Sequence, residues 1–389
     1  MTTRRYYQRG LTLLELLVAI TLGLAVITGT IQIYLSTSQT YRTQEALSRI
    51  QENGRYALEV LTREIRMATY TGCPPAPGQL FANVLNNPGN NWWSDLGTFR
   101  VREFQQASLQ GFSGGDSFPA RSDGTSSTQR VAGTEALIVI GGSNRSYSIV
   151  DHDPDPVNSR FTLNNLQDLQ TGNIFLVCDS NQISIAQVTD TPAGNTFKHE
   201  ETGSAPGNCT ALLGSPDPAA ILAAGDDPNA IDICADAVQY TFGSNAILTR
   251  LTPLAYYIGH STAKDDDDTP LSTSLFRIRA PGNPQELIEH VDDMRVLYGV
   301  DTGPPDEQIN DYVEAADVTD WRNVLSLRLD LLLASPPGIR VINEAQTVFF
   351  PPEGFDSNDD LVSGIPLDFD DGRLRQAFST TIGLRNRLP

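Results

Sequence analysis

The stretch "RGLTLLELLVAITLGL" at residues 9–24 is an apolar run with a single acidic residue, Glu15, five positions after Gly10. The run continues to Leu35 and is interrupted only by one Gln and by scattered Thr and Gly residues. About 20 apolar residues are enough to cross a bilayer as a helix. We therefore expect residues 11–35 to span a membrane. Because a carboxylate in a membrane helix is energetically unfavourable, we expect Glu15 to have a function.

The residues on either side of the apolar run predict its orientation. Residues 1–10, "MTTRRYYQRG", contain three arginines and no acid, so they are expected to stay in the cytoplasm while the rest of the chain is exported. A secretory signal peptide has a shorter apolar stretch that ends at a small-residue cleavage site. No such site follows this run, and cleavage after Gly10 would leave the whole run on the mature chain.

The segment 36–72 is polar but periodic, which predicts an amphipathic continuation of the same helix. The continuous helix is expected to run from Leu11 to about Tyr70, with Pro74 as its stop. Small and apolar residues recur every three or four positions along one narrow face: Leu47, Ile50, Gly54, Ala57, Leu61, Ile65 and Ala68.

The remaining body, residues 73–389, is long enough for one large or two smaller domains. The chain has 389 residues and a formal net charge of −20, and a body this acidic repels nucleic acid, so direct nucleic-acid binding is not expected. Residues 74–130 are rich in Pro, Gly, Asn and Ser and contain Trp92 and Trp93. We expect an ordered but irregular insertion there.

Short β-rich segments dominate the rest of the body. Leucines alternate with polar residues from Leu325 to Leu331, the period-2 pattern of a strand covered on one face. An antiparallel sheet packed on the second half of the helix would bury both apolar stripes, which predicts an α+β fold. The expected strands lie at 135–142, 173–178, 182–188, 237–243, 254–260, 294–300, 324–333 and 377–386.

Four cysteines occur at long intervals and without C-x-x-C spacing. An even number in an exported domain predicts two disulfides, for which three pairings exist. We favour Cys73 with Cys178, which would tie the helix end to the sheet, and Cys209 with Cys234. Four unpaired buried thiols are the alternative.

Catalytic and metal-site motifs are weak. The segment "GFSGG" at 111–115 matches G-x-S-x-G with Ser113 as nominal nucleophile, but it lies in a Gly- and Ser-rich loop and lacks the strand and helix that the motif requires. The histidines, His152, His199, His260 and His290, are isolated in sequence. We therefore expect no enzyme activity, no zinc site and no cofactor.

Acidic runs at 151–156, 264–269 and 368–372 could offer oxygen ligands to calcium, but none has the spacing of an EF-hand loop. We interpret them as solvated loops and expect no metal.

The N-terminal stretch resembles the type IV prepilins, which carry a short basic leader ending in Gly and then an apolar helix with Glu at its fifth residue. Here the leader ends at Gly10, and Glu15 is the fifth residue after it. The residue after the cleaved bond is usually Phe in that family and is Leu11 here.

Further segments resemble the PilW family of minor pilins. They are "QENGRYALEVLTREIRMATYTGC" (51–73), "VDDMRVLYGVD" (291–301), "TDWRNVLSLRLDLLL" (319–333) and "RLRQAFSTTIGLRNRL" (373–388), whereas the middle of the chain, 74–290, matches only loosely. This resemblance implies a pilin-like fold and a low-abundance subunit in the inner membrane and then near the pilus tip. Its task there would be to help start pilus assembly and to support twitching motility or adhesion.

The resemblance also implies partners and residue roles. Prepilin peptidase would cut between Gly10 and Leu11 and methylate the new amine of Leu11. Glu15 would then pair with the Leu11 amine of another subunit as the helices enter a filament. Other minor pilins and the major pilin would contact the N-terminal helix, and a PilY-type adhesin is a possible partner at the tip.

Three alternatives stay open. Glu15 lies only about 6 Å along the helix from Leu11, so it could simply serve its own helix terminus, where acids are favoured. The chain could instead be a J-type minor pseudopilin of type II secretion, which has the same leader and helix. A membrane-anchored periplasmic binding module is the third reading.

Overall fold

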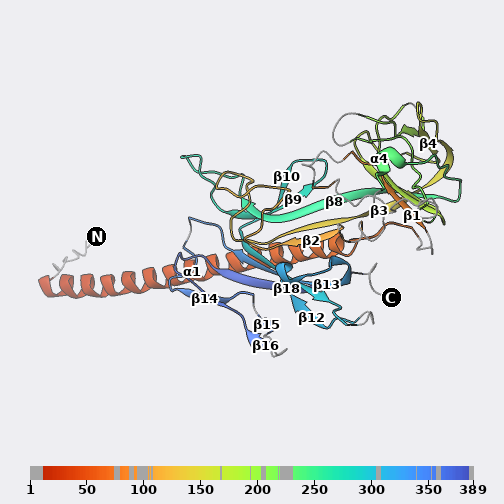
Figure 1. The fold of residues 1–389 in the computed structure, drawn as a ribbon. Helices are drawn as coiled ribbons and strands as arrows, with labels where there is room; N and C mark the ends of the chain where they lie inside the picture. The colour runs from red at the N-terminus through yellow and green to blue at the C-terminus, as the bar shows by residue number, and fades with distance from the viewer. Residues whose placement is uncertain are drawn as a thin grey trace, which may run out of the picture.

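The computed structural model is a long helix whose second half is packed into a large β-rich body (Figure 1). Helix α1 extends from Leu13 to Ile65, and its first part projects from the body as a bare rod. The residues that the structure describes are 12–73, 79–86, 92–93, 104, 106, 108–166, 169–192, 194–202, 207–217, 219, 231–303, 308–338, 340–351, 353–355 and 361–384.

The larger sheet has ten strands, in the order β1-β6-β5-β8-β3-β4-β7, with β2 on β3, β9 on β8 and β10 on β9. All described pairings in it are antiparallel except the parallel pair β1–β6. Its strands are β1 (Leu80–Asn83), β2 (Leu109–Phe112), β3 (Ala136–Asp153), β4 (Arg160–Leu163), β5 (Ile174–Cys178), β6 (Gln182–Gln187), β7 (Thr196–Lys198), β8 (Ile247–His260), β9 (Thr273–Arg279) and β10 (Pro284–Glu289).

The smaller sheet has four antiparallel strands in the order β12-β11-β13-β18. They are β11 (Val291–Val300), β12 (Asp311–Val313), β13 (Val324–Ala334) and β18 (Arg375–Gly383). Two ribbons follow β13, namely β14 (Gln346–Phe349) with β17 (Pro366–Phe369) and β15 (Glu353–Phe355) with β16 (Leu361–Ser363). The short helices are α4 (Ile233–Asp236), η1 (Ala315–Asp317) and η2 (Trp321–Asn323).

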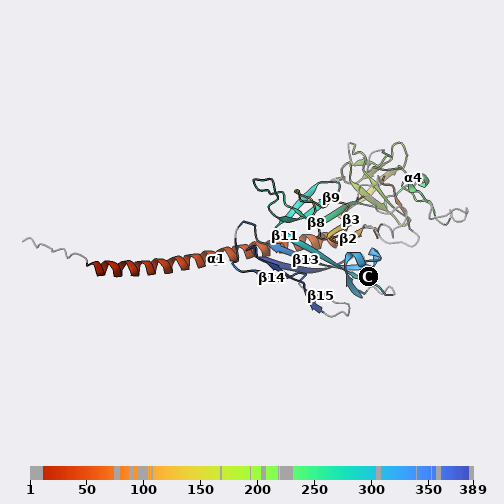
Figure 2. The same cartoon turned by 60° about the vertical axis from the view of Figure 1, so that its left-hand side comes forward.

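The second half of α1 lies between the two sheets (Figures 1 and 2). Its buried stripe, which includes Ile50, Leu61 and Ile65, packs in one core with Tyr256 of the larger sheet and Leu329 of the smaller one. Fully burying one such apolar side chain is worth roughly 1.5–3 kcal/mol. The body is therefore assembled around α1, as the apolar periodicity of residues 47–68 predicts.

The two long strands β3 and β8 connect this helix core to a distal lobe, which we define as β1, β4, β5, β6, β7 and α4. The lobe lies beyond the end of α1 (Figure 1). The register between β3 and β8 shifts between Gly142 and Ser146, so the strands bend where they leave the helix core. The lobe has its own apolar cores, one of which includes Phe161, Phe175 and Phe197.

Regular helix ends at Ile65, about five residues before the predicted end near Tyr70. Residues 66–69 form turns, and the Thr69 N–H donates to the carbonyl oxygen of Ile140 on β3 at 3.0 Å. Thr69 has a positive φ of 63°, which α-helix does not allow. A tertiary bond to the sheet thus replaces the last helical turn.

The predicted strand at 237–243 is wrong. These residues are irregular except for an isolated bridge between Val238 and Gly214. The side chain of Phe242 is nevertheless buried in the distal lobe, so the apolar residues of the segment fill a core without pairing in the sheet. Within the predicted insertion 74–130, the structure places strands β1 and β2 and buries Trp93.

The other expected strands coincide with elements of the structure. They fall in β3, β5, β6, β8, β11, β13 and β18, and the last ends at Gly383 before the described residues end at 384. The structure is therefore α+β, with a long apolar N-terminal helix and a β-rich domain.

Candidate functional site

The N-terminus of α1 is closed by a capping box between Thr12 and Glu15. The Thr12 N–H and hydroxyl donate to Oε2 of Glu15 at 2.9 and 3.0 Å, and the Glu15 N–H donates to the Thr12 hydroxyl at 3.2 Å. Glu15 therefore satisfies its own helix terminus in this chain. Gly10 and Leu11 lie outside the described residues, so their predicted processing stays a prediction.

The sequence analysis did not name Thr12. Its signal was present in the order Thr12-Leu13-Leu14-Glu15, because Thr followed three residues later by Glu, just before an apolar run, is a capping signature.

The first half of α1 exposes a continuous apolar surface. Its large apolar side chains project from the rod from Leu13, which is 77% exposed, to Leu35, which is 60% exposed. The helix is long and apolar enough to cross a membrane, and none of its most apolar window is buried in the body. Residues 13–35 span about 35 Å at 1.5 Å per residue, close to the roughly 30 Å of a hydrocarbon core.

Three threonine hydroxyls within this half are satisfied inside the helix. The hydroxyls of Thr21, Thr28 and Thr30 each donate to a backbone carbonyl three or four residues earlier, at 2.8–2.9 Å. Side-chain hydroxyls that bond to their own helix do not require water, so they are compatible with a lipid environment.

The apolar half ends at two exposed tyrosines. Tyr34 is 71% exposed and Tyr41 is 66% exposed, and Arg42 is the first charged residue after Glu15. Tyrosines concentrate at membrane–water interfaces, and charges follow in the aqueous phase. This order of residues marks where a lipid surface would lie against α1.

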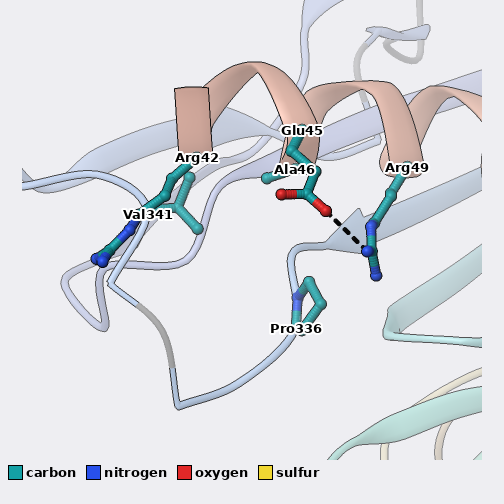
Figure 3. Close-up of a pocket in the computed structure, with 6 residues that line it drawn as sticks. All are labelled: Arg42, Glu45, Ala46, Arg49, Pro336 and Val341. Carbon is teal, nitrogen blue, oxygen red and sulfur yellow. Dashed lines mark hydrogen bonds and ion pairs between the residues drawn. The ribbon is translucent and has the colours of Figure 1, made fainter. Parts of the chain in front are cut away.

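The body meets α1 around Tyr41, at a junction formed by the loop after β13 (Figure 3). The carbonyl oxygen of Val341 accepts from the Gln39 amide and, at 3.2 Å, from the Thr43 hydroxyl. A cavity of about 130 Å³ lies between helix and loop. It is lined by Arg42, Glu45, Ala46, Arg49, Pro336 and Val341.

The charged residues of that cavity are partly neutralised, since Arg49 and Glu45 form an ion pair at 2.8 Å (Figure 3). Both side chains are about half exposed, so the pair adds little stability. The junction is therefore a contact that helps to fix the direction of α1 relative to the body.

The far end of α1 is held to the larger sheet by Glu64. Its carboxylate accepts from Arg277 at 2.8 and 3.1 Å, from Arg279 at 3.1 Å and from the Tyr256 hydroxyl. Burial and the adjacent Glu64 raise the pKa of Tyr256 well above its ordinary value, so the phenol remains a donor. We refer to these four residues as the Glu64 clamp.

Gly54 lets the smaller sheet approach α1 closely. A Cβ at this position would lie 2.6 Å from ring atoms of Phe378 on β18. Any other residue would displace that ring, which explains a glycine inside a helix that it otherwise destabilises.

The structure pairs the cysteines as the sequence analysis favours. Cys73 and Cys178 are joined with a Cα–Cα distance of 6.0 Å, and this bond links the segment after α1 to β5. Cys209 and Cys234 are joined with a Cα–Cα distance of 5.4 Å within the distal lobe. All four cysteines are paired.

Two histidines that are isolated in sequence meet in the distal lobe. The Nε2 atoms of His152 and His199 lie 3.2 Å apart, and Nδ1 of His152 accepts from the Phe242 N–H at 3.0 Å. Burial lowers the pKa of His152 to about 4 and that of His199 well below its ordinary value. Both are therefore neutral core residues at pH 7.

Metal-binding geometry is not present among the described residues, where no three His, Cys, Asp or Glu side chains converge. In the acidic run 264–269, the Asp265 carboxylate accepts from the Asp267 and Thr269 N–H groups at 3.0 and 2.8 Å. In the run 368–372, Asp371 binds Arg375 at 2.7 Å. Both carboxylates stabilise their own loops.

Strand β2 ends directly before Ser113, where a loop was expected, but turns and no helix follow in residues 113–124, so the region does not form a nucleophile elbow. The backbone carbonyl of Ser113 accepts from Arg130 at 2.9 Å, and its N–H donates to Asp116 at 2.7 Å. No histidine contacts Ser113 among the hydrogen bonds of the described residues, so its hydroxyl has no general base there.

A second buried acid joins the two sheets. Glu135, at the start of β3, accepts from the Val296 N–H of β11 at 2.7 Å and from Arg295 at 3.4 Å. Burial raises the pKa of Glu135 to about 7, against the opposing effects of these two donors.

Comparison with known proteins places this geometry in context. Residues 255–386 match the type IV pilus-assembly protein W (PilW) family model, and residues 5–31 match the prokaryotic N-terminal methylation motif. Among solved structures, the type IV-like pilin TTHA1219 from Thermus thermophilus is 16% identical, with 57% of this chain and 86% of that chain covered and a TM-score of 0.20. No curated protein matches the chain.

The two family matches fall on the two parts described above. The methylation motif covers the leader and most of the exposed apolar half of α1, and the PilW match covers the strands from β8 to β18 that enclose its packed half. Over residues 255–386 the chain is therefore similar to the PilW family, and over residues 5–31 it is similar to proteins that carry the N-terminal methylation motif.

Proposed function

We propose that this protein is a minor subunit of a type IV pilus. It is first anchored in the inner membrane by α1 and then enters the filament through the same helix. The observation that carries the proposal is the continuity of α1. One unbroken helix exposes an apolar surface over its first half and is enclosed by both sheets over its second half. Movement of the helix from lipid into a filament would therefore carry the body with it.

Processing would prepare the helix terminus. Hydrolysis of the Gly10–Leu11 bond on the cytoplasmic side leaves an amine on Leu11, one residue before the Thr12–Glu15 capping box. Such an amine has an ordinary pKa of about 7.7–8 and is largely cationic at neutral pH. Methylation at this nitrogen keeps the charge.

In the filament, Glu15 would exchange its own helix cap for the Leu11 amine of a neighbouring subunit. The capping box supports this step because it holds the Glu15 carboxylate at the helix terminus, one turn from Leu11. The body is expected in the periplasm, since the arginines of the leader hold the N-terminus in the cytoplasm.

A position at the tip is supported by the shape of the body. The distal lobe extends beyond the end of α1, where a subunit stacked above it would have to pack (Figure 1). At a tip that space is free. We therefore propose that the subunit helps initiate assembly in a tip complex with other minor pilins and a PilY-type adhesin, and so supports twitching motility and adhesion.

The test uses a strain that lacks the chromosomal copy and expresses full-length variants. Glu15→Gln should reduce surface pili and twitching about tenfold, because one partner of a buried ion pair is lost. Glu59→Gln is the matched control, since Glu59 is exposed on the packed half of α1 and should leave both unchanged. Mass spectrometry of the mature N-terminus should find methylated Leu11.

Three results would contradict the proposal. They are an intact Met1 terminus, unchanged piliation with Glu15→Gln, and loss of protein secretion with normal pili. The last would assign the chain to a type II secretion pseudopilus.

A further inference from the structure

Strand β18 forms one edge of the four-stranded sheet. It pairs with β13 over nine consecutive residue pairs without a register shift. Just beyond its ends, the Leu384 N–H donates to the Leu325 oxygen at 2.9 Å and the Ser335 N–H donates to the Leu374 oxygen at 2.8 Å. Even-numbered residues therefore bond to β13, and the backbone groups of odd-numbered residues point outward.

The first outward position is already occupied. The Arg375 N–H donates to Oε1 of Gln346, and the Gln346 amide donates to the Arg375 carbonyl, both at 2.8 Å. No hydrogen bond from the described residues reaches the outward N–H and C=O groups of the next four outward positions, which are Ala377, Ser379, Thr381 and Gly383.

This edge lacks the protection that sheet edges normally have. Proteins block edges by making them short or by adding charge, proline or a bulge. Strands β1, β7 and β12 have only three or four residues, and β10 begins with a proline, contains a bulge and carries two glutamates. Residues 376–384, "QAFSTTIGL", contain neither charge nor proline.

We propose that β18 is a docking strand that receives an extended segment of a different subunit by β-augmentation. Four outward residues supply the main-chain bonds. Phe378 and Ile382 line the face toward α1, whereas Ser379 and Thr381 are exposed on the other face. The fitting segment is therefore uncharged, about seven residues long, and alternates apolar with small polar side chains.

A second copy of this chain that paired through its own β18 does not fit as the occupant. Strand β18 runs lengthwise along the packed half of α1 in both views (Figures 1 and 2). Two β18 strands paired about a two-fold axis would be antiparallel, so their α1 helices would point in opposite directions. Copies anchored in one membrane cannot do this. This exclusion of a second copy rests on the proposed membrane anchoring. The observation that the edge of β18 is open does not depend on that proposal.

The test is cross-linking of the full-length protein in its own cells from a photoreactive residue at position 381. The blocking variant combines Ala377→Pro with Gly383→Pro, which removes two outward N–H donors and leaves the bonds to β13 in place. The matched control, Ala377→Ser with Gly383→Ala, keeps both donors. We expect cross-links to one segment of another subunit, reduced about tenfold by the prolines and unchanged in the control.

Amide hydrogen exchange gives a second readout that needs no substitution. The outward amides of 377–383 should exchange slowly in membranes that contain the partner and rapidly in the isolated full-length protein. If the proline variant fails to form the Cys73–Cys178 bond, it is misfolded, and hydrogen exchange of the unsubstituted protein then tests the proposal.

The proposal is overturned by cross-links that the prolines do not reduce, by cross-links only to a second copy of this chain, or by equal exchange in both samples. Loss of the methylated Leu11 terminus or of the Glu15 effect would contradict the proposed pilus function instead, so the two failures are distinguishable.

Discussion

Buried ionisable residues determine how this body responds to pH, and they act in opposite directions. Glu135 lies between the two sheets, and the His152–His199 pair lies in the aromatic core of the distal lobe. In each case burial disfavours the charged form. An acid that is harder to ionise destabilises the body as pH rises, and a histidine that is harder to protonate destabilises it as pH falls.

Glu135→Gln should make the body more stable to unfolding at neutral pH relative to acidic pH, because the ionised form of Glu135 is disfavoured in the folded state. The folded pKa is about 7 and the unfolded value 4.5, so the folded chain holds the proton more tightly and stability falls as pH rises from 4.5 to 7. This difference amounts to about 3 kcal/mol. Urea unfolding of the variant should show a smaller decrease between pH 5 and pH 8 than the parent, and equal slopes would refute the assignment.

His152→Asn should have the opposite signature. The folded pKa of about 4 lies below the unfolded 6.5, so the stability from neutral His152 is complete above pH 6.5 and is lost as pH falls toward 4. Asn keeps an acceptor for the Phe242 N–H. Near-ultraviolet circular dichroism should follow acid unfolding of the lobe, and the variant should lose about 3 kcal/mol less than the parent over this range.

At the scale of elements, α1 is the component on which the others are arranged. Gly54 on its buried stripe lets the smaller sheet approach closely, because a Cβ there would overlap the Phe378 ring. Beyond Ile65 the chain is no longer α-helical, and the Thr69 N–H donates to the Ile140 oxygen on β3. The element is therefore shaped by its neighbours as much as by its own propensity.

Gly54→Leu should destabilise the body even though leucine favours helix. Its side chain would overlap the Phe378 ring, and overpacking of this kind costs about 1–3 kcal/mol. Gly29→Leu is the matched control, since nothing lies within 4 Å of a Cβ there. Thermal unfolding of the detergent-solubilised protein should shift for the first variant alone, and equal shifts would contradict the packing account.

Sequence patterns predicted elements well where one periodicity acts alone. The apolar run and the stripe at 47–68 lie in α1 and the turns directly after it, and the stripe is buried apart from Leu47. The alternation in β13 predicted the strand correctly, but its expected one-sided burial is wrong, because Ser326 and Asp330 on the other face are buried too. Sequence patterns failed where a distant contact decides the outcome. Residues 237–243 have a strand-like composition, yet Phe242 fills an aromatic core and its N–H binds His152, 90 residues away.

The site was predictable to a similar extent. The two cysteine pairs could be predicted because four cysteines allow only three pairings, whereas the assembly role of Glu15 stays a prediction. The contacts of Glu64 could not be predicted, since its partners Arg277 and Arg279 are more than 200 residues away. The meeting of His152 and His199 likewise depends on how β3 and β7 lie on either side of β4, which no local pattern encodes.

At the scale of the whole molecule, the helix core and the distal lobe are joined by two long strands and one covalent link. Strands β3 and β8 continue from the helix core into the distal lobe, and the Cys73–Cys178 bond ties the end of the helical segment to β5. The loop that this bond closes has a sequence separation of 105 residues. Its effect should therefore reach beyond its immediate surroundings.

Replacement of Cys73 and Cys178 by Ala should separate unfolding of the lobe from unfolding of the helix core. Loss of a link that closes a loop of this length costs about 4–5 kcal/mol in the chain-entropy model. Cys209→Ala with Cys234→Ala is the control, because it closes a loop with a separation of only 25 residues. Calorimetry should show two transitions for the first pair and one for the control, and a single transition in both would contradict this expectation.

The enclosure of α1 between two sheets also has a mechanical consequence. A pull on the apolar half along the helix axis loads the enclosed half in shear, so its contacts with both sheets resist together and do not peel apart one after another. The Glu64 clamp lies at the far end of the helix, and the disulfide at Cys73 follows only nine residues later. Tension would thus pass from lipid or filament through packed helix to a covalent bond before it reached the distal lobe.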